Sequence, residues 1–336
     1  MKTTPKNCLV VGPSWVGDMV MAQSLFMILK EHNSDLNIDV LAPSWSEPLL
    51  ERMPEVRNSI SMPVGHGKLQ LGLRYKIGKQ LRNNNYDWTI LLPNSLKSAL
   101  IPYWAKIPKR TGFKGEMRYG LLNDLRHLDK TKLTMTVQRF VSLGLSDQTI
   151  VPDEYPFPSL ELDQKIVKDT LKNFDLDTEK PVFALCPGAE FGPAKRWPIE
   201  YFAEIAQIKH QEGWQVWIFG SEKDQNVSRS IADQSKVECI NLAGKTSLAE
   251  AIDLLSQASY VVTNDSGLMH VAAALDRPLT ALYGSSDPNF TPPLNDQARI
   301  ISLGLECSPC FQRECPLEHL NCLREIKPEN VISSIK

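Results

Sequence analysis

Short apolar runs alternate with longer stretches of helical periodicity along most of this chain. The apolar runs have the length of strands and are bounded by Gly, Pro or Asn. We expect strands at residues 8–11, 38–41, 88–92, 182–186, 216–219, 260–263 and 279–283. Helical patterns follow most of them, for example at residues 19–30, 200–211 and 248–257. This alternation predicts repeated βα units, and therefore an α/β fold with largely parallel sheets.

The chain divides into two halves with the same alternation. Its 336 residues, 42% of them hydrophobic, are enough for two domains that each have a core. The best candidate for the linker between them is VPDEYPFPSLEL, which starts at Val151 and contains three prolines. The pattern therefore predicts two Rossmann-like domains, residues 1–155 and 156–336, without a short tandem repeat.

The charge balance excludes one broad class of partner. Lys and Arg number 37 and Asp and Glu number 39, so the chain lacks the overall basic field that nucleic-acid binding usually needs. The N-terminal sequence MKTTPKNCLVVG has no signal-peptide core, and no apolar run approaches the roughly 18 residues of a membrane span. These features predict a cytoplasmic protein with no transmembrane segment and no nucleic-acid partner.

The loop after the first predicted strand reads GPSWVGDM. Its two glycines have the spacing of a phosphate-binding P-loop, but Asp18 stands where that motif has a lysine, which argues against nucleotide phosphate here. A carboxylate at a strand-to-helix turn is kept ionised by the helix N-terminus and can act as a general base. The alternative is that Asp18 only caps a helix that begins near Met19, and spacing does not separate the two interpretations.

Two loops of the second half contain candidate groups for a nucleotide. CPGAEFGPAKRWP combines glycines such as Gly188 with Lys195, and backbone N–H groups together with a lysine suit a pyrophosphate. The alternative is a solvated loop with a surface Lys-Arg pair. The segment WIFGSEKD places Glu222 and Asp224 just after a predicted strand, where an acidic side chain can bridge ribose hydroxyls.

The strongest phosphate signal is VVTNDSGLMHVAAAL. It places Asp265, Ser266 and Gly267 between a strand and a helix of small residues, with His270 four residues after Ser266 on the same helix face. Backbone N–H groups of Ser266, Gly267 and Leu268 would point out of the helix start and could bind an anion. The alternative is that Asp265 or Ser266 is an ordinary N-cap and His270 a core histidine. YGSSDPNFTPP, after residues 279–283, either lines the same cleft or forms a plain turn cluster.

Five segments together resemble one family. GPSWVGDM, PNSLKSAL at 93–100, GEMRYGLLND at 115–124, CPGAEFGPAKRWP and NDSGLMHVAAAL at 264–275 resemble the ADP-heptose:lipopolysaccharide heptosyltransferases of type II, in glycosyltransferase family 9, in matching order over nearly the whole chain. The resemblance implies a GT-B fold, in which two Rossmann-like domains face each other across a cleft. It places the acceptor on the N-terminal domain and ADP-heptose on the C-terminal domain, with the last residues crossing back to the first domain.

The resemblance also implies roles for individual residues. It assigns the general base to Asp18 and a phosphate contact to Lys195. Its donor-binding positions fall on Gly188, Asp265, Ser266, Gly267 and His270, with Glu222 at the ribose and Asp224 as the alternative, and its acceptor contacts fall on Gly17, Lys97 and Arg118. The implied reaction moves a heptose from ADP-L-glycero-D-manno-heptose to the first heptose of the lipopolysaccharide inner core. It inverts the anomeric carbon and needs no cofactor or catalytic metal.

Basic residues gather in the first half of the chain. Residues 66–86 contain five Lys or Arg and no Asp or Glu, and a second run from Lys97 to Arg118 is interrupted only by Glu116. Such runs suit the acceptor that the resemblance implies, heptosyl-Kdo-lipid A at the inner face of the inner membrane, and would place the enzyme at the periphery of that membrane. The alternative for residues 66–86 is a solvated helix face.

Four of the seven cysteines lie close together near the C-terminus. They are Cys307, Cys310, Cys315 and Cys322, with His319 between the last two. The first pair has the C-x₂-C spacing of a zinc knuckle, and thiolates with an imidazole suit tetrahedral zinc. The second half of the cluster is irregular, and reduced thiols are usual in the cytosol. A structural zinc clip, reduced thiols and a disulfide all remain open.

Two rival functions are compatible with the same loops. One is a GT-B transferase that uses another nucleotide-sugar, because the loops identify pyrophosphate and ribose better than they identify heptose. The other is a non-catalytic nucleotide-sugar-binding protein, which would bind ADP tightly without turnover.

Overall fold

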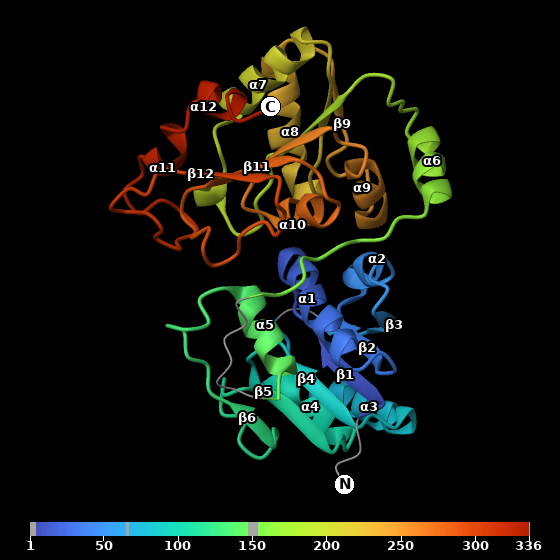
Figure 1. Cartoon of the computed structure of the whole chain (residues 1–336). Coiled ribbons are helices and arrows are strands. Elements are labelled where there is room, and N and C mark those ends of the chain that lie inside the picture. Colours follow the sequence, from blue (N-terminus) through green and yellow to red (C-terminus); the bar gives the residue numbers. More distant parts are fainter. Residues whose placement is uncertain (1–4, 65–66, 147–153, 336) are drawn as a thin grey trace. The chain divides into compact units, whose positions relative to one another are not determined.

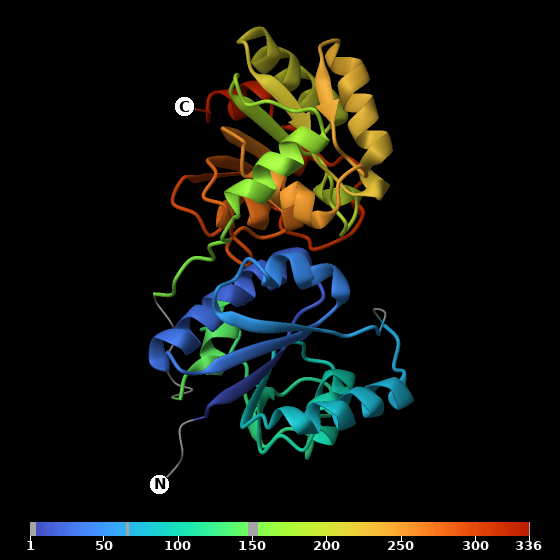
Figure 2. The same cartoon turned by 90° about the vertical axis from the view of Figure 1, so that its right-hand side faces the viewer.

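The computed structural model describes residues 5–64, 67–146 and 154–335. Contacts divide the chain into two compact units, Met1–Pro158 and Ser159–Lys336. Each unit is built on one parallel sheet that helices cover on both faces (Figure 1; Figure 2). The division at Pro158 lies three residues beyond the predicted boundary, and residues 151–153 of the predicted linker lie outside the described residues.

The first unit contains a six-stranded sheet in the order β3-β2-β1-β4-β5-β6, with all neighbouring strands parallel. Its two central strands are buried along almost their whole length, as expected of a parallel sheet covered on both faces. The strands are β1 (Asn7–Val11), β2 (Asn37–Ala42), β3 (Val56–Ser61), β4 (Trp88–Leu91), β5 (Lys109–Phe113) and β6 (Asp124–Arg126).

Two helix pairs cover this sheet. Helix α1 packs against α5, and α3 packs against α4. Residues of α3 and α4, such as Ile77 and Ile101, share one apolar core with Leu9 and Leu91 of the sheet. The helices are α1 (Val16–His32), α2 (Glu47–Leu50), α3 (Leu71–Leu81), α4 (Leu96–Trp104) and α5 (Thr136–Gly144).

The second unit repeats this topology. Its sheet has the order β12-β11-β10-β7-β8-β9. Read from the β9 edge, with β7 counted as the first strand of the unit, this is the same order as in the first sheet. All neighbouring strands are again parallel. The strands are β7 (Val182–Cys186), β8 (Gln215–Ile218), β9 (Cys239–Asn241), β10 (Tyr260–Asn264), β11 (Leu279–Tyr283) and β12 (Ala298–Ser302).

The last helices of the chain belong to the second unit. Helix α12 packs on α7, and Leu323, Ile326 and Val331 are buried in the core formed with β7 and β8. These helices therefore cover the second sheet. The helices of this unit are α6 (Gln164–Asn173), α7 (Ile199–Gln211), α8 (Gln225–Ser235), α9 (Leu248–Leu255), α10 (Gly267–Ala274), α11 (Asn321–Arg324) and α12 (Pro328–Ile332).

The predicted α/β fold with two Rossmann-like sheets is confirmed. All seven predicted strands and all three predicted helices are present, with ends that differ by at most a few residues. The strands that the apolar pattern did not reveal are β3, β5, β6, β9 and β12, most of them toward the sheet edges, where polar residues interrupt the pattern. Among the described residues, no helix is both long enough and apolar enough to span a membrane.

Two glycines of α3 test the packing of this helix. A Cβ added to Gly78 would lie 2.8 Å from the carbonyl oxygen of Ile101 and 2.8 Å from the Cβ of Trp104, whereas one added to Gly72 would meet nothing within 4 Å. We expect Gly78→Ala to lower the free energy of unfolding by about 1–3 kcal/mol, because α4 must move. Gly72→Ala should raise it by up to about 1 kcal/mol through helix propensity. Denaturant unfolding followed by tryptophan fluorescence measures both, and equal shifts of the same sign would contradict this packing.

Candidate functional site

The strand order of each sheet defines one place for a ligand. In the first sheet the order reverses between β1 and β4, and in the second between β7 and β10. Ligands of open parallel sheets bind outside the carboxyl ends of the strands at this switch point. The loops there are residues 12–15 and 92–95 in the first unit, and residues 187–198 and 265–266 in the second. Four of the segments singled out in the sequence therefore flank the two switch points.

Asp18 lies in the first turn of α1, directly after β1. The helix begins at Val16, and its N-cap residue is Trp15, whose extended backbone has φ −121° and ψ 144°. Asp18 is thus the third residue of the helix, and the alternative that it caps a helix beginning near Met19 is wrong. The residue is half-buried, and its carboxylate belongs to the first turn, at the positive end of the helix dipole. Gly17, in the same turn, is buried.

Arg118 joins the loops that follow β4 and β5. Its guanidinium donates hydrogen bonds to the carbonyl oxygen of Pro93 at 2.7 Å and to Oδ1 of Asn94 at 3.3 Å. It also donates to the carbonyl oxygen of Phe113. Only 1% of the residue is exposed, and this burial lowers the pKa of Arg118 to about 10. This burial leaves little of the guanidinium exposed for the expected contact with an acceptor, whereas its hydrogen bonds hold the loop after β4 in place.

The segments 93–100 and 115–124 form one structure through further contacts. The backbone N–H of Leu96, in the first turn of α4, donates to Oε2 of Glu116 at 2.9 Å. The backbone N–H of Glu116 donates in turn to the carbonyl oxygen of Asn94 at 3.0 Å. Gly115 allows this approach, because a Cβ there would lie 2.0 Å from that same oxygen. Lys97, half-buried in the first turn of α4, is therefore held at the switch point of the first sheet.

At the switch point of the second sheet, a buried carboxylate pairs with a lysine. The Nζ atom of Lys195 forms an ion pair with Oδ2 of Asp265, and the Oγ of Ser286 donates a hydrogen bond of 2.5 Å to the same oxygen. The side chain of Asp265 is 6% exposed and that of Lys195 is 16% exposed. Sequence analysis did not single out Ser286, although its segment YGSSDPNFTPP was expected to line this cleft or form a turn. The structure places Ser286 against Asp265.

The side chain of Asn264 holds the Lys195 loop against β10. The backbone N–H of Trp197 donates to Oδ1 of Asn264 at 3.1 Å, and Nδ2 of Asn264 donates to the carbonyl oxygen of Pro187 at 2.7 Å. Asn264 is fully buried at the end of β10. The loop after β7 is therefore fixed at both ends to the strand beside it, which argues against a freely solvated loop at Lys195.

The start of α10 has the properties expected of an anion site. Ser266 is the N-cap residue, but its side chain makes no capping hydrogen bond, and its Oγ lies 3.4 Å from Oγ1 of Thr263. Ser266 and Gly267 are half-exposed residues, while Asp265 before them is buried. Uncapped N–H groups at a helix start can donate to an anion. Lys195, paired with Asp265, brings a positive charge to the same place.

His270 is a buried histidine in α10. It is 5% exposed, and burial lowers the pKa of its imidazole to about 4; the charge of Lys195 acts in the same direction and that of Asp265 against it. The ring is therefore neutral at pH 7. His270 is therefore buried, as the interpretation of a core histidine predicted. It also lies close enough to Lys195 and Asp265 for both charges to affect its pKa.

The two acidic candidates for a ribose differ in their surroundings. Asp224 is buried, and its Oδ2 accepts hydrogen bonds from the backbone N–H and the Oγ of Ser221, at 2.9 and 2.7 Å. The same oxygen would lie 2.6 Å from a Cβ added to Gly188, so the glycine gives the carboxylate its space. Glu222 is exposed. Asp224 thus serves the loop structure, and Glu222 is the better candidate for a ligand contact.

The clustered cysteines surround one small cavity. Cys307, Cys310, Cys315, Cys322 and His319 line a space of about 20 Å³, together with the buried Ser285 and neighbouring residues. All four thiols are free of disulfides, and the described residues contain no group of three or more side chains arranged to hold a metal ion. Burial and the neighbouring thiols raise the pKa of Cys322 to about 11. In this structure the four thiols are therefore unbridged and gathered around one cavity.

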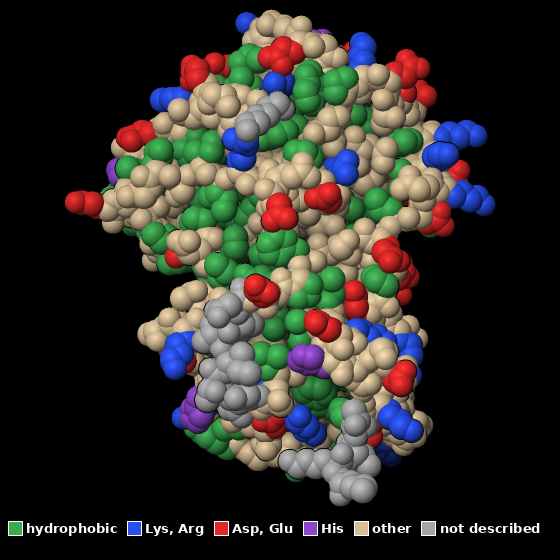
Figure 3. All heavy atoms as spheres, in the orientation of Figure 1, with side chains coloured by type: hydrophobic (Ala, Val, Ile, Leu, Met, Phe, Trp, Pro, Cys, Tyr) green, Lys and Arg blue, Asp and Glu red, His purple; other side chains and the backbone are tan. Residues whose placement is uncertain are grey.

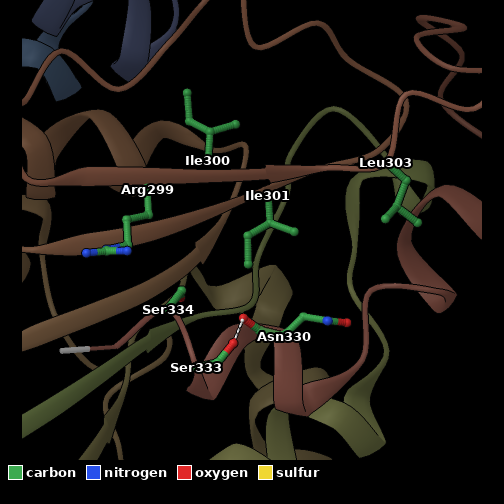
Figure 4. Close-up of a pocket in the computed structure, with 7 residues that line it drawn as sticks. All are labelled: Arg299, Ile300, Ile301, Leu303, Asn330, Ser333 and Ser334. Atoms are coloured by element: carbon green, nitrogen blue, oxygen red, sulfur yellow. Dashed lines mark hydrogen bonds between the residues drawn. The ribbon is translucent and has the colours of Figure 1, made fainter.

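A larger hollow lies away from all of these residues. It has a volume of about 500 Å³ and lies between edge strand β12 and helix α12 (Figure 4). Figure 4 shows Ile301 directed toward Ser333 and Ser334, and Ile300 directed away from them. No residue singled out in the sequence lines this hollow, so its size alone does not make it the candidate site. Its lining residues are Arg299, Ile300, Ile301, Leu303, Asn330, Ser333 and Ser334.

Comparisons with known proteins agree on one family. Residues 74–321 match the family model described as glycosyltransferase family 9 (heptosyltransferase). The chain is 52% identical to lipooligosaccharide heptosyltransferase 2 of Haemophilus influenzae over 88% of either chain, and 47% identical to lipopolysaccharide heptosyltransferase 2 of Salmonella typhimurium over 97% of either chain. It is also similar to the solved structure of E. coli ADP-heptose lps heptosyltransferase II, with 45% identity and a TM-score of 0.87, over 98% of this chain and 97% of that one.

The depressed pKa of His270 predicts a pH dependence of stability. Its pKa is about 4 in the folded chain against an ordinary value of 6.5, so the unfolded chain binds more protons between these values. Its contribution to stability is therefore present above about pH 6.5 and is lost as the pH falls toward 4, by up to about 3 kcal/mol. We expect His270→Gln to flatten the curve of unfolding free energy against pH in this window. His32→Gln, at an exposed position, is the control, and equal slopes for the two variants would refute the effect.

Proposed function

The chain belongs to glycosyltransferase family 9, the heptosyltransferases, and on that premise we propose that it moves a heptose from ADP-L-glycero-D-manno-heptose to the first heptose of the lipopolysaccharide inner core. Relatives that are 46–52% identical are named heptosyltransferase 2, which supports this acceptor. The observation that carries the proposal is the pairing of Lys195 with Asp265 beside the uncapped start of α10. This is a pyrophosphate site at the switch point of a Rossmann-like sheet.

The donor would be held by three parts of the second unit. The pyrophosphate would accept hydrogen bonds from the N–H groups at Ser266 and Gly267 and from the ammonium of Lys195. A lysine has three donors, so Lys195 can keep its contact with Asp265 while it binds a phosphoryl oxygen. Glu222, exposed after β8, would accept hydrogen bonds from the ribose hydroxyls. Gly188 keeps the loop after β7 close to Asp224, which shapes the same edge of the sheet.

Asp18 would act as the general base. A hydroxyl of the acceptor heptose loses its proton to the Asp18 carboxylate while its oxygen attacks the anomeric carbon of the donor. ADP leaves from the opposite face, so the anomeric configuration is inverted in a single displacement. The negative charge that grows on the leaving pyrophosphate is stabilised by Lys195 and by the helix start at Ser266. These groups supply the acid–base and electrostatic parts of the reaction, so the proposal includes no cofactor.

The acceptor would bind to the first unit. Gly17 keeps the turn beside Asp18 free of side-chain atoms, and Lys97 places a positive charge at the start of α4 for an anionic group of the inner core. Arg118 would act indirectly, through the loop that it holds. This acceptor is a glycolipid, heptosyl-Kdo-lipid A, so the enzyme would work at the inner face of the inner membrane. No helix among the described residues could anchor it there by spanning the bilayer.

Replacement of Asp18 by Asn tests the base. The amide keeps the shape of the side chain and removes its basicity, so we expect kcat to fall by about 10²–10⁴-fold while ADP-heptose still binds. Mass spectrometry of the glycolipid product measures the transfer, and Asp35→Asn, an exposed site in the same unit, is the control. Near-normal kcat in Asp18→Asn would remove the base assignment. If the enzyme used UDP- or GDP-sugars and not ADP-heptose, the proposed donor would be wrong.

Replacement of Lys195 by Ala tests the pyrophosphate site. The lysine would stabilise the negative charge of the phosphoryl groups, which is present in the bound donor and grows during the reaction. Without it, KM for ADP-heptose should rise and kcat should fall. Loss of a charged hydrogen bond predicts a decrease of kcat/KM of roughly 10–100-fold. Ser286→Ala, which removes only a donor to Asp265, should have a smaller effect of the same kind. Lys172→Ala is the exposed control, and kinetics of Lys195→Ala equal to this control would move the site to Arg196.

A further inference from the structure

Charge is distributed very unevenly between one part of the first unit and the rest of the chain. Residues 56–115 contain 11 Lys or Arg and a single acidic residue, Asp87, although the whole chain has slightly more acidic than basic residues. Asp87 lies just before β4, and its Oδ2 accepts hydrogen bonds from the backbone N–H groups of Lys6 and Asn7. On the second unit, by contrast, acidic and basic side chains are interspersed over the face shown in Figure 3.

The arginines of this segment serve the fold. Arg74 is 3% exposed and donates to the carbonyl oxygens of Leu69 at 2.7 Å and Lys97 at 3.2 Å. In the same way, Nε of Arg82 donates to the carbonyl oxygen of Trp104, and Nε of Arg110 to that of Leu121. The lysines behave differently. Six of them are exposed, namely Lys68, Lys76, Lys79, Lys106, Lys109 and Lys114.

The outer face of α3 combines these lysines with large apolar side chains. Leu71 is 51% exposed and Tyr75 is 47% exposed, and Lys76 and Lys79 lie on the same side of the helix. Leu69, in the loop that leads into α3, is 48% exposed. The opposite side of α3 is buried against α4 and the sheet. A helix that presents leucine, tyrosine and lysine outward, with no acidic residue, has the composition of a helix that lies in a membrane interface.

We infer that α3 and the loop of residues 67–70 dock the first unit on an anionic phospholipid bilayer. Leu69, Leu71 and Tyr75 would enter the headgroup region, and Lys76 and Lys79 would contact lipid phosphates. The purpose of the docking, to bring the enzyme to a lipid-anchored acceptor, rests on the proposed function. The docking surface itself contains none of the proposed catalytic residues.

The docking surface is connected to the candidate acceptor site. Arg74, within α3, donates to the carbonyl oxygens of Lys68 and Leu69 before the helix and to that of Lys97 at the start of α4. One guanidinium thus fixes the lipid-facing loop to the switch point of the first sheet. A glycolipid could keep its acyl chains in the bilayer while its sugar reaches that switch point.

Helix α6 of the second unit offers a matched control surface. Ile166 is 50% exposed, close to the value for Leu71, and Lys165 and Lys168 are exposed beside it. Asp163 and Asp169 lie on or next to the same helix, so its local field is nearly neutral. If any exposed lysine and apolar pair sufficed for membrane binding, α6 would contribute as much as α3.

The experiment measures co-sedimentation of the full chain with vesicles. Wild type should bind vesicles of phosphatidylethanolamine with phosphatidylglycerol, bind vesicles of phosphatidylcholine far more weakly, and be released at about 0.5 M salt. The α3 variant Leu71→Gln/Lys76→Glu/Lys79→Glu should bind at least tenfold more weakly, since each basic residue near such a surface contributes roughly fivefold. If its circular dichroism differs from wild type, Lys76→Gln/Lys79→Gln replaces it.

The α6 variant Ile166→Gln/Lys165→Glu/Lys168→Glu should bind like wild type. Equal binding by the α3 and α6 variants, or no binding of wild type to anionic vesicles, would overturn the inference. Binding only when the vesicles contain the glycolipid acceptor would overturn it as well, because the acceptor and not the bilayer would then be recognised. Transfer to detergent-dispersed acceptor should be unchanged in the α3 variant. Absence of transfer in wild type would instead refute the proposed function and leave the vesicle result standing.

Discussion

The carboxylate of Asp265 joins three loops of the second unit. Its own loop follows β10, Lys195 belongs to the loop after β7, and Ser286 follows β11; these three strands are neighbours in the sheet. An unpaired carboxylate at 6% exposure would be strongly destabilising, so the ion pair and the hydrogen bond are what allow it to lie there. The ammonium of Lys195 is thereby held at the switch point of the sheet by a partner within the protein.

The first unit has the same sheet topology, but the buried charged group beside its switch point is positive and not negative. There the buried group is the guanidinium of Arg118, whose planar array of donors binds the backbone after β4 and β5. Its lowered pKa reflects the burial that this arrangement imposes. Two sheets with one strand order therefore present different chemistry, because the loops at the switch points differ. In the first unit these loops carry a carboxylate, Asp18, on a helix start, and in the second they carry the lysine and open N–H groups that suit phosphate.

Most of the fold could be read from the sequence for a simple physical reason. Strands in the middle of a parallel sheet are buried on both faces, so β1, β4, β7 and β10 stand out as continuous apolar runs. Strand β3, at a sheet edge, has the sequence VRNSIS and is mostly half-buried or exposed, and β5 begins with two basic residues. Such strands are held by backbone hydrogen bonds to their neighbours, and a pattern of side chains does not report these bonds.

The sequence by itself determined the two α/β halves, the loops that carry candidate chemistry and the family that those loops resemble. It did not determine which charged side chains the fold uses. Arg118, Arg74 and Asp224 were indistinguishable in sequence from Lys97, Lys76 and Glu222, but the first three are buried and bound to neighbouring loops. The same holds for Ser286 and its contact with Asp265. These partners are brought together only when parallel strands align their carboxyl ends, so tertiary structure alone decided which charged groups hold the loops in place and which do not.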